Sequence, residues 1–344
     1  MHSTAGLPLA STRAAGGRRD EQTPPPVARD AGEVEVREGV ELRHLDDELF
    51  DGAGATKRDL VDHVVAVADR LLPEVVGRSL TVVRVRPGQR PFVQKNLPAS
   101  APAWVRVREV WSEASQRTVR SPVADDVRTL VWLAGQRAVE LHPTVLDGEG
   151  RVTHLVLDLD PPEGAAVAAV VRAARLVRRA LDDAGLVGAV KTSGAKGLHV
   201  VVPVRDVAVE DAAAATRALA ARAERLDPAA ATTAFLLADR GGRVYLDPTR
   251  AGGGTLAALW SPRVRPGTPV SVPVAWDSLD DVVPGRPALR DAAALAAGED
   301  LWRAALPDPQ QVPEDLLAEG RTIPPPRAAA MHEGRRRARA HREA

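Results

Sequence analysis

Apolar positions recur at helical or strand spacing along most of the chain. The run ATKRDLVDHVVAVADRLLPEV carries apolar residues at helical spacing, with Thr56 as an N-cap and Asp59 three residues later, and predicts one helix. The run LTVVRVRPG alternates apolar and polar residues, as half-buried strands do. Helical periodicity returns in VADDVRTLVWLAGQRAV. The first half is therefore expected to mix helices and strands.

The second half repeats this alternation. It predicts a strand at residues 155–160, a helix at 164–185, a strand–turn–strand unit at 189–204, a helix at 209–228, a short strand at 242–248 and a final strand pair within 261–276. Strands and helices mixed in this way indicate one α/β or α+β domain. We place that domain at about residues 33–300.

The two ends of the chain differ in composition from this central part. Residues 1–32 mix Gly, Ser, Thr, Arg and Pro and predict a disordered leader. Residues 301–344 are expected to form a C-terminal extension, first Pro-rich and then closing in the basic tail GRRRARAHREA. The 344 residues are 44% hydrophobic, which is enough for a sizeable core.

Charge and cysteine content exclude several classes of protein. Basic and acidic residues balance at 46 each, so net charge gives no argument for nucleic acid, although a local basic cleft is compatible with it. The absence of cysteine excludes disulfides, thiolate zinc sites and a cysteine nucleophile. The sequence has neither an apolar run of about eighteen residues nor a signal-peptide core. We therefore expect a cytoplasmic protein with no membrane partner.

The strand HLVLDLD, residues 154–160, separates leucines from carboxylates. Strand side chains alternate between two faces, so the three leucines share one face, expected in the core, while Asp158 and Asp160 end the other. Two carboxylates this close repel each other, and a cation between them would relieve the repulsion. Their hard oxygen ligands favour Mg²⁺ or Mn²⁺. A solvated strand end is the alternative interpretation.

The stretch KTSGAKGLHV surrounds a tight turn with polar and cationic side chains: Lys191, Ser193, Lys196 and His199. Gly194 and Gly197 permit the turn and leave backbone N–H groups facing outward. The stretch is not a P-loop, because it lacks that spacing and precedes a strand. It favours a cradle for a triphosphate, although a hairpin turn with incidental charges fits it equally well.

A third stretch, RGGRVYLDPTR, ends a short strand in Asp247, which could be a third metal carboxylate. Arg240, Arg250 and Arg263 could face phosphates, although arginine is abundant throughout the chain. In two-metal phosphoryl transfer, carboxylates hold the cations and basic groups neutralise the charge that develops on the leaving pyrophosphate. In combination, the three stretches indicate that chemistry.

These stretches resemble the three motifs of the archaeo-eukaryotic primase superfamily. LVLDLDPPEG, VKTSGAKGLHVVVPV and RVYLDPTR match more closely the polymerase domain of bacterial DNA ligase D and its stand-alone relatives. Further stretches agree: TKRDLVDHVVAVADRLLPEVVGRSLTVVRVRPG, FVQKNLPASAPAWVRV, TLVWLAGQRAVELHPT and RVRPGTPVSVPVAWDSL. The resemblance covers about residues 40–285. It implies a primase-polymerase fold, with mixed sheets and an RRM-like catalytic core flanked by helices.

The resemblance also implies roles for individual residues. Asp158, Asp160 and Asp247 would be the catalytic ligands of two Mn²⁺ or Mg²⁺ ions. The nucleotide-binding residues would be Ser193, Lys196, His199, Arg240, Arg263, Arg84, Lys95, His142 and Arg250. The implied reaction adds NTPs or dNTPs, with ribonucleotides preferred, to DNA 3′ ends, templated or untemplated, in gap filling or non-homologous end joining. The implied partners are DNA ends or gapped DNA, Ku and a separate DNA ligase, in the nucleoid.

Parts of the chain depart from that family pattern. The loop PTRAGGGT after Asp247 is one residue shorter and lacks an aromatic and an Arg-Asn pair, and Thr144 stands where relatives have Trp. ELRHLDDELF lacks the lysine of an Asn-Pro-Asp-Lys stretch in the region that meets a 5′-phosphate. These differences bear on rate, template handling and 5′-phosphate recognition. The chain contains no K-x-D-G motif, so we expect no fused ligase module in it.

Two other functions use the same features. A catalytically weakened member could bind DNA ends together with Ku and a separate ligase, as the altered loop after Asp247 suggests. The three retained carboxylates argue against a dead enzyme. A phosphohydrolase could use the same metals, but the Ser/Lys/His turn suits a nucleoside triphosphate better.

Overall fold

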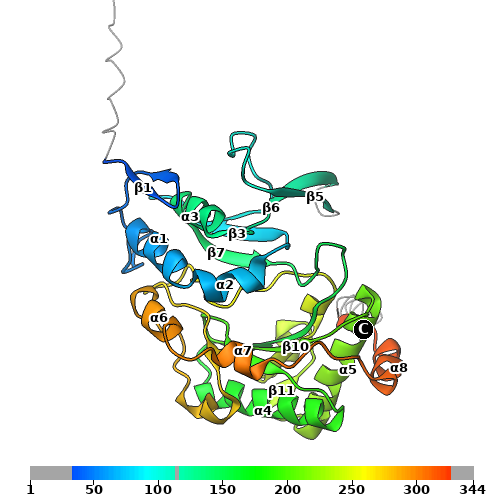
Figure 1. The fold of residues 1–344 in the computed structure, drawn as a ribbon. Helices are drawn as coiled ribbons and strands as arrows, with labels where there is room; N and C mark the ends of the chain where they lie inside the picture. Colours follow the sequence, from blue (N-terminus) through cyan, green and yellow to red (C-terminus); the bar gives the residue numbers. More distant parts are fainter. Residues whose placement is uncertain (1–32, 113–115, 327–344) are drawn as a thin grey trace, which may run out of the picture.

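The computed structural model describes residues 33–112 and 116–326 (Figure 1). The predicted leader and the basic tail lie outside the described residues. The mixed α/β architecture expected from the sequence is confirmed. The limits of the catalytic domain and its extension stay predictions. Within the described part of the chain, no helix is both long and apolar enough to cross a membrane.

The first half forms helices around a small antiparallel sheet of order β4-β3-β7, with two separate hairpins. Its elements are β1 Glu35–Arg37, β2 Val40–Leu42, α1 Lys57–Ala66, α2 Ala68–Val75, β3 Leu80–Arg84, β4 Phe92–Gln94, β5 Val107–Ser112, β6 Arg117–Pro122, α3 Val127–Gly135 and β7 Ala138–Pro143. Figure 1 shows these elements together in the colours from blue to green.

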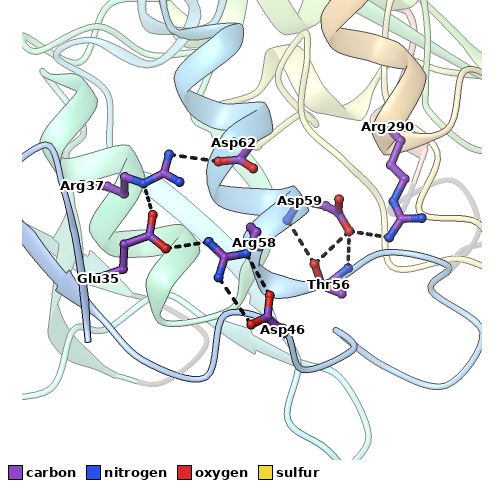
Figure 2. Close-up of polar contacts among 8 residues, drawn as sticks. All are labelled: Glu35, Arg37, Asp46, Thr56, Arg58, Asp59, Asp62 and Arg290. Atoms are coloured by element: carbon purple, nitrogen blue, oxygen red, sulfur yellow. Dashed lines mark hydrogen bonds and ion pairs between the residues drawn. The ribbon is translucent and has the colours of Figure 1, made fainter. Parts of the chain in front are cut away.

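The helix predicted across residues 55–75 forms as two helices that meet at Val67. Its start is as expected, because the Thr56 hydroxyl accepts from Asp59 N at 3.2 Å while Asp59 Oδ2 accepts from Thr56 N at 2.7 Å. Arg290 reaches the same carboxylate from α6, Leu289–Ala296 (Figure 2). The break follows from Val67 itself, whose ψ of 7° departs from helical geometry.

The second half forms a six-stranded sheet of order β11-β12-β8-β10-β9-β13. Its elements are β8 His154–Asp160, α4 Val167–Asp183, β9 Ala189–Thr192, β10 Leu198–Pro203, α5 Val209–Leu226, β11 Ala231–Thr232, the short 3-10 helix η1 Leu237–Asp239, β12 Val244–Asp247, the 3-10 helix η2 Thr249–Ala251, β13 Pro273–Val274 and the 3-10 helix η3 Trp276–Asp281. The strands and helices predicted between residues 155 and 248 are therefore confirmed.

The two faces of β8 differ as predicted. Leu155, Leu157 and Leu159 are buried in a core that also contains apolar residues of α4 and α5. In Figure 1, α4 lies on the side of β10 away from the N-terminal elements. These helices cover the leucine face of the sheet. The other face of β8, which carries Asp158 and Asp160, is turned toward the rest of the molecule.

The C-terminal elements return to both halves. They are α6 Leu289–Ala296, α7 Leu301–Ala305 and α8 Glu314–Thr322. Trp302 belongs to the core of the N-terminal elements and Leu316 to the core beneath the six-stranded sheet. The strand pair predicted within 261–276 was wrong in part, because β13 pairs with β9 and the segment itself is joined by one isolated bridge, between Pro262 and Val270.

Candidate active site

The acidic face of β8 opens into a cavity of about 430 Å³. Ten of the twelve predicted site residues line it: His142, Asp158, Asp160, Ser193, Lys196, His199, Arg240, Asp247, Arg250 and Arg263. They come from β7, β8, the β9–β10 turn, β10, β12, η2, the segment after η1 and the segment between η2 and β13. The fold therefore brings together groups that lie far apart in the sequence.

Strand pairing places four polar side chains in one row across the sheet. Asp158 on β8 is the Cα partner of Asp247 on β12 and of His199 on β10. His199 is in turn the partner of Lys191 on β9. Directly paired residues point to the same face of a sheet. The row Asp247–Asp158–His199–Lys191 therefore faces the cavity side, and we call it the polar row.

The Arg250 guanidinium and the His199 imidazole approach Asp158 without making close ion pairs. Arg250 Nη2 lies 3.3 Å from Asp158 Oδ2, and His199 Nε2 lies 3.5 Å from Asp158 Oδ1. Arg250 Nε is 3.9 Å from Asp247 Oδ2. Burial raises the pKa of Asp158, Arg250 partly offsets this, and the Asp247 and Asp160 carboxylates raise it further. The site thus holds a carboxylate at an electrostatic cost.

Asp160 is held between two other cations. Lys196 Nζ lies 3.5 Å from Asp160 Oδ1, and Arg240 Nη1 lies 3.3 Å from Asp160 Oδ2. Lys196 is also 3.5 Å from Glu163 and remains partly exposed. Both cations can turn toward a ligand anion, because their contacts with Asp160 are long for a charge-assisted hydrogen bond.

The three aspartates offer the hard oxygen donors that Mg²⁺ and Mn²⁺ prefer. Asp158 and Asp247 are register partners, and Asp160 follows on the same face of β8. Within residues 33–112 and 116–326, no group of three or more His, Asp or Glu side chains converges as a formed metal site. The donor chemistry fits a divalent cation, while Arg240, Arg250 and Lys196 now neutralise the carboxylates.

The turn between β9 and β10 is closed by its own serine. Ser193 Oγ accepts from Ala195 N at 3.2 Å and from Gly197 N at 3.1 Å. Gly194 adopts a φ of +71°, which favours glycine, and a Cβ at Gly197 would lie 2.3 Å from Leu159 O. The turn therefore packs directly on β8, between the two aspartates of that strand.

His199 is buried and neutral. Burial lowers its pKa well below the ordinary value, and nearby Lys191, Arg263 and Arg250 lower it further. Among the described residues, its Nδ1 has no hydrogen-bond partner. A neutral imidazole beside Asp158 can donate one hydrogen bond to a ligand oxygen without adding a full charge.

Glu140 is a member of the site that the sequence reasoning missed. His142 Nε2 lies 2.7 Å from Glu140 Oε2, Arg263 Nε lies 3.0 Å from the same oxygen, and Val264 N donates to Oε1 at 2.8 Å. Burial alone would raise the pKa of Glu140, but the hydrogen bond from His142 and the charge of Arg263 bring it to about 2. Strand alternation in ELHP, which puts Glu140 and His142 on one face, was the available signal.

Arg263 links Glu140 to the β9–β10 turn, because its Nη1 donates to Ser193 O. Tyr245 is a second member that was missed. The Arg240 guanidinium stacks 3.9 Å from the centre of its ring, and the Tyr245 hydroxyl donates to Asp247 Oδ1 at 3.4 Å. Aromatic and carboxylate neighbours thus orient the arginines on both sides of the cavity.

Arg84 and Lys95 do not line this cavity. Arg84 Nε donates to Gln136 O at 2.7 Å, and the residue lines a separate pocket of about 130 Å³ that also includes Trp132. Lys95 lines a groove of about 570 Å³ beside β5 and β6, which shares Thr255 with the cavity. Their nucleotide-binding role stays a prediction, and a role there would require contacts that this arrangement lacks.

The altered loop after Asp247 folds tightly against the site. Thr249 N donates to Asp247 Oδ1 at 2.9 Å, and Gly254 N donates to Arg250 O at 2.9 Å. The 3-10 turn between these contacts presents Arg250 to Asp158. The shortened loop therefore keeps its arginine in the cavity.

Known proteins are similar to this chain in sequence and in fold. The family model described as LigD, primase-polymerase domain, matches residues 56–302. The multifunctional non-homologous end joining DNA repair protein LigD of Mycobacterium tuberculosis is 36% identical over 280 residues, which is 77% of this chain and 36% of that protein. The bifunctional protein LigD of Bacillus subtilis is 32% identical over 247 residues, 70% of this chain and 39% of that protein. The chain thus spans little more than a third of these relatives.

One solved structure matches this chain over nearly the whole length of the solved protein. The polymerase domain of Mycobacterium tuberculosis ligase D, in complex with DNA, superimposes with a TM-score of 0.70 and 34% identity. The match covers 78% of this chain and 99% of that one. Sequence and fold lead to the same assignment: the chain belongs to the LigD primase-polymerase domain family.

Proposed function

We propose that this chain is a metal-dependent nucleotidyltransferase that adds nucleotides to DNA 3′ ends during gap filling or non-homologous end joining. One observation carries the proposal. A single cavity brings the carboxylates Asp158, Asp160 and Asp247 against the β9–β10 turn and several cations. Phosphoryl transfer between anionic partners needs both kinds of group.

The chemistry follows from the charges. The primer 3′-hydroxyl attacks the α-phosphorus of a bound nucleoside triphosphate, a new P–O bond forms, the α–β P–O bond breaks, and pyrophosphate leaves while the hydroxyl proton passes to solvent. Ser193, Lys196 and the neutral His199 lie where they can bind phosphate oxygens. Arg240 and Arg263 can neutralise the charge that develops on the leaving pyrophosphate.

Asp158, Asp160 and Asp247 would hold the divalent cations, Mn²⁺ or Mg²⁺. When bound, such ions supply Lewis acidity at the phosphates and favour the ionised hydroxyl. The raised pKa of Asp158 supports this assignment, because a cation would replace the stabilisation that burial removes. Arg240, Arg250 and Lys196 would then turn from the carboxylates to the phosphates.

The finer features of the proposal are substrate and partners. The family resemblance supports ribonucleotides over deoxyribonucleotides, with or without a template. It also supports DNA ends or gapped DNA as the nucleic acid, and Ku and a separate DNA ligase as partners. Phosphate contacts by arginine would make DNA binding strongly dependent on salt.

The test is extension of a labelled gapped primer with Mn²⁺ and each NTP or dNTP. We expect the wild type to extend it and the double variant Asp158→Ala, Asp160→Ala to lose extension by about a thousandfold or more. The matched control is Asp182→Ala, Asp183→Ala, which removes two exposed carboxylates at the end of α4. A wild type that binds the DNA and extends nothing would overturn the enzyme and favour a DNA-end binding module.

A further inference from the structure

Lys191 is a fully buried cation at the end of the polar row. Its side chain is among the largest in the molecule with relative exposure below 2%. It does not line the cavity, but its strand partner His199 does. None of the site chemistry described above uses Lys191.

The Lys191 ammonium is fixed by two neutral acceptors. Nζ donates to Ala257 O at 2.8 Å and to Ser271 Oγ at 2.9 Å. Ala257 lies in the wall of the cavity, and Ser271 Oγ donates in turn to Thr192 O at 2.6 Å. One ammonium therefore ties β9, the cavity wall and the strand-like segment before β13 together.

Lys191 has charged neighbours but, in the described chain, no ion pair with a carboxylate. The titratable and charged groups that face it are Glu74 and Arg78 at the end of α2, His154 and Asp158 on β8, His199 on β10, and Arg263. Glu74 accepts instead from Trp302 Nε1 at 2.9 Å, and burial raises its pKa. A buried charge without a paired counter-ion is costly.

We propose that Lys191 is a positioning residue of the nucleotide site, which fixes the cavity wall at Ala257 and supplies buried positive charge for which the bound triphosphate is the counter-ion. The inference rests on the nucleotide-binding role proposed above. The Lys191 ammonium lies one strand away from His199, so its field reaches the cavity through the low-dielectric interior.

The proposed role predicts that the affinity for a triphosphate depends on pH. Burial lowers the pKa of Lys191 to about 7, and a bound polyanion favours the charged form, so binding takes up a proton wherever the free side chain is neutral. The affinity for a triphosphate then falls as the pH rises above about 7. His199 does not contribute, because its pKa lies well below its ordinary value and it is already neutral.

Lys57 provides a matched control. It is also a buried lysine, and its Nζ donates to a backbone carbonyl, Arg43 O, at 2.7 Å. It does not line the cavity. Lys57→Met and Lys191→Met therefore each remove a buried ammonium that donates to a backbone carbonyl. Only Lys191 lies beside the nucleotide site.

The experiment is a titration of each variant with ATP at about pH 6 and about pH 8.5, together with primer extension. We expect Lys191→Met to bind ATP about tenfold more weakly than wild type at the lower pH. Its affinity should also lack the wild-type decline toward the higher pH. In extension, KM for the nucleotide rises while kcat changes little. Ser271→Ala removes one acceptor, keeps the charge, and should keep the wild-type pH dependence.

The outcomes separate this inference from the proposed function. If Lys191→Met matches Lys57→Met in affinity and in pH dependence while the wild type extends primers, the inference is overturned alone. A wild type that binds ATP with the Lys191-dependent pH profile and extends no primer overturns the polymerase and leaves the inference standing. A wild type that does not bind ATP overturns both.

Discussion

Two groups of charged side chains use the same residue types and pair them differently. At the start of α1 lies a surface group that we call the α1 cluster (Figure 2): Glu35, Arg37, Asp46, Arg58, Asp59, Asp62 and Arg290. In it, Arg58 Nε lies 2.8 Å from Asp46 Oδ1 and Arg290 Nη2 lies 2.8 Å from Asp59 Oδ2. In the cavity, no cation in the described part of the chain comes closer than 3.3 Å to Asp158 or Asp160.

Burial also differs between Asp46 in the α1 cluster and Asp158 in the cavity. The Asp46 side chain is 82% exposed, whereas the Asp158 side chain is 20% exposed. Exposed pairs gain little from close geometry, because water screens them. Buried charges that stay loosely paired cost stability, and such clusters gather at functional sites. Closed pairs therefore serve structure, both in the α1 cluster and between Arg263 and Glu140 at the cavity. The loose pairs around Asp158 and Asp160 instead mark acids that can bind a ligand.

The largest expected effect comes from a change that alters no charge. Gly197→Ala would put a Cβ 2.3 Å from Leu159 O, so the β9–β10 turn must move away from β8. We expect a loss of about 3 kcal/mol in the free energy of unfolding and loss of primer extension. Denaturant titration and the extension assay measure the two.

The control for that substitution is Gly298→Ala. Its Cβ would have only Leu295 O nearby, at 3.4 Å, an ordinary contact. We expect the free energy of unfolding to change by less than about 1 kcal/mol. Primer extension should remain normal. If Gly197→Ala behaved like Gly298→Ala, the close packing of the turn on β8 would not be needed for the site.

A smaller effect, with opposite signs in the two regions, is expected from removing one acid. Asp158→Asn should stabilise the fold near neutral pH, because burial raises the pKa of the Asp158 carboxyl and the charged form is therefore costly in the folded state. Asp46→Asn should destabilise it slightly, since the hydrogen bond from Arg58 lowers the pKa of Asp46. Chemical denaturation of both variants measures the difference.

The pH dependence follows from the signs of these shifts. The destabilisation by Asp158 is complete above its raised folded-state pKa and is gone below the ordinary value of 3.8. The stabilisation by Asp46 is present above 3.8 and is lost as the pH falls through its lowered pKa. Both variants should therefore approach the wild type in acid, from opposite sides. If both substitutions changed the free energy of unfolding in the same direction at neutral pH, the distinction between the two regions would be wrong.

The smallest effect is expected from Arg58→Ala in the α1 cluster. It removes contacts to Asp46 and Glu35 on the surface. Because water screens exposed ion pairs, the free energy of unfolding should change little, and primer extension should be unaffected. The same change at Arg250 removes the cation beside Asp158 and should lower extension strongly. Comparable losses of extension in both variants would show that the α1 cluster belongs to the site.

The local pattern of the sequence predicted much of the second half of the fold. Alternation in HLVLDLD separated the buried leucines from Asp158 and Asp160, and the structure keeps that division. The Thr56 capping box was also predicted from spacing alone. Such features depend on neighbours in the chain, so a single sequence contains them.

Features that depend on pairing between residues far apart in the sequence could not be predicted. Nothing local shows that Asp247 would pair with Asp158, or that Lys191 would end the same row. Arg84 was assigned to the site by family resemblance, but a register shift after Val83 accompanies its contact with Gln136. Glu140 was missed because its place in the site depends on contacts with two residues, His142 and Arg263. Arg263 lies on a loop that is distant in the sequence.

The polar row also has a consequence for how the chain acquires activity. Between Asp158 and Asp247 the chain passes through α4, β9, β10 and α5 before β12 can dock beside β8. Such non-local pairings form slowly, because the entropy of closing long loops opposes them until the contacts are made. A chain that has collapsed but has not yet placed β12 lacks the site, so recovery of catalysis after refolding should follow the last sheet-forming phase.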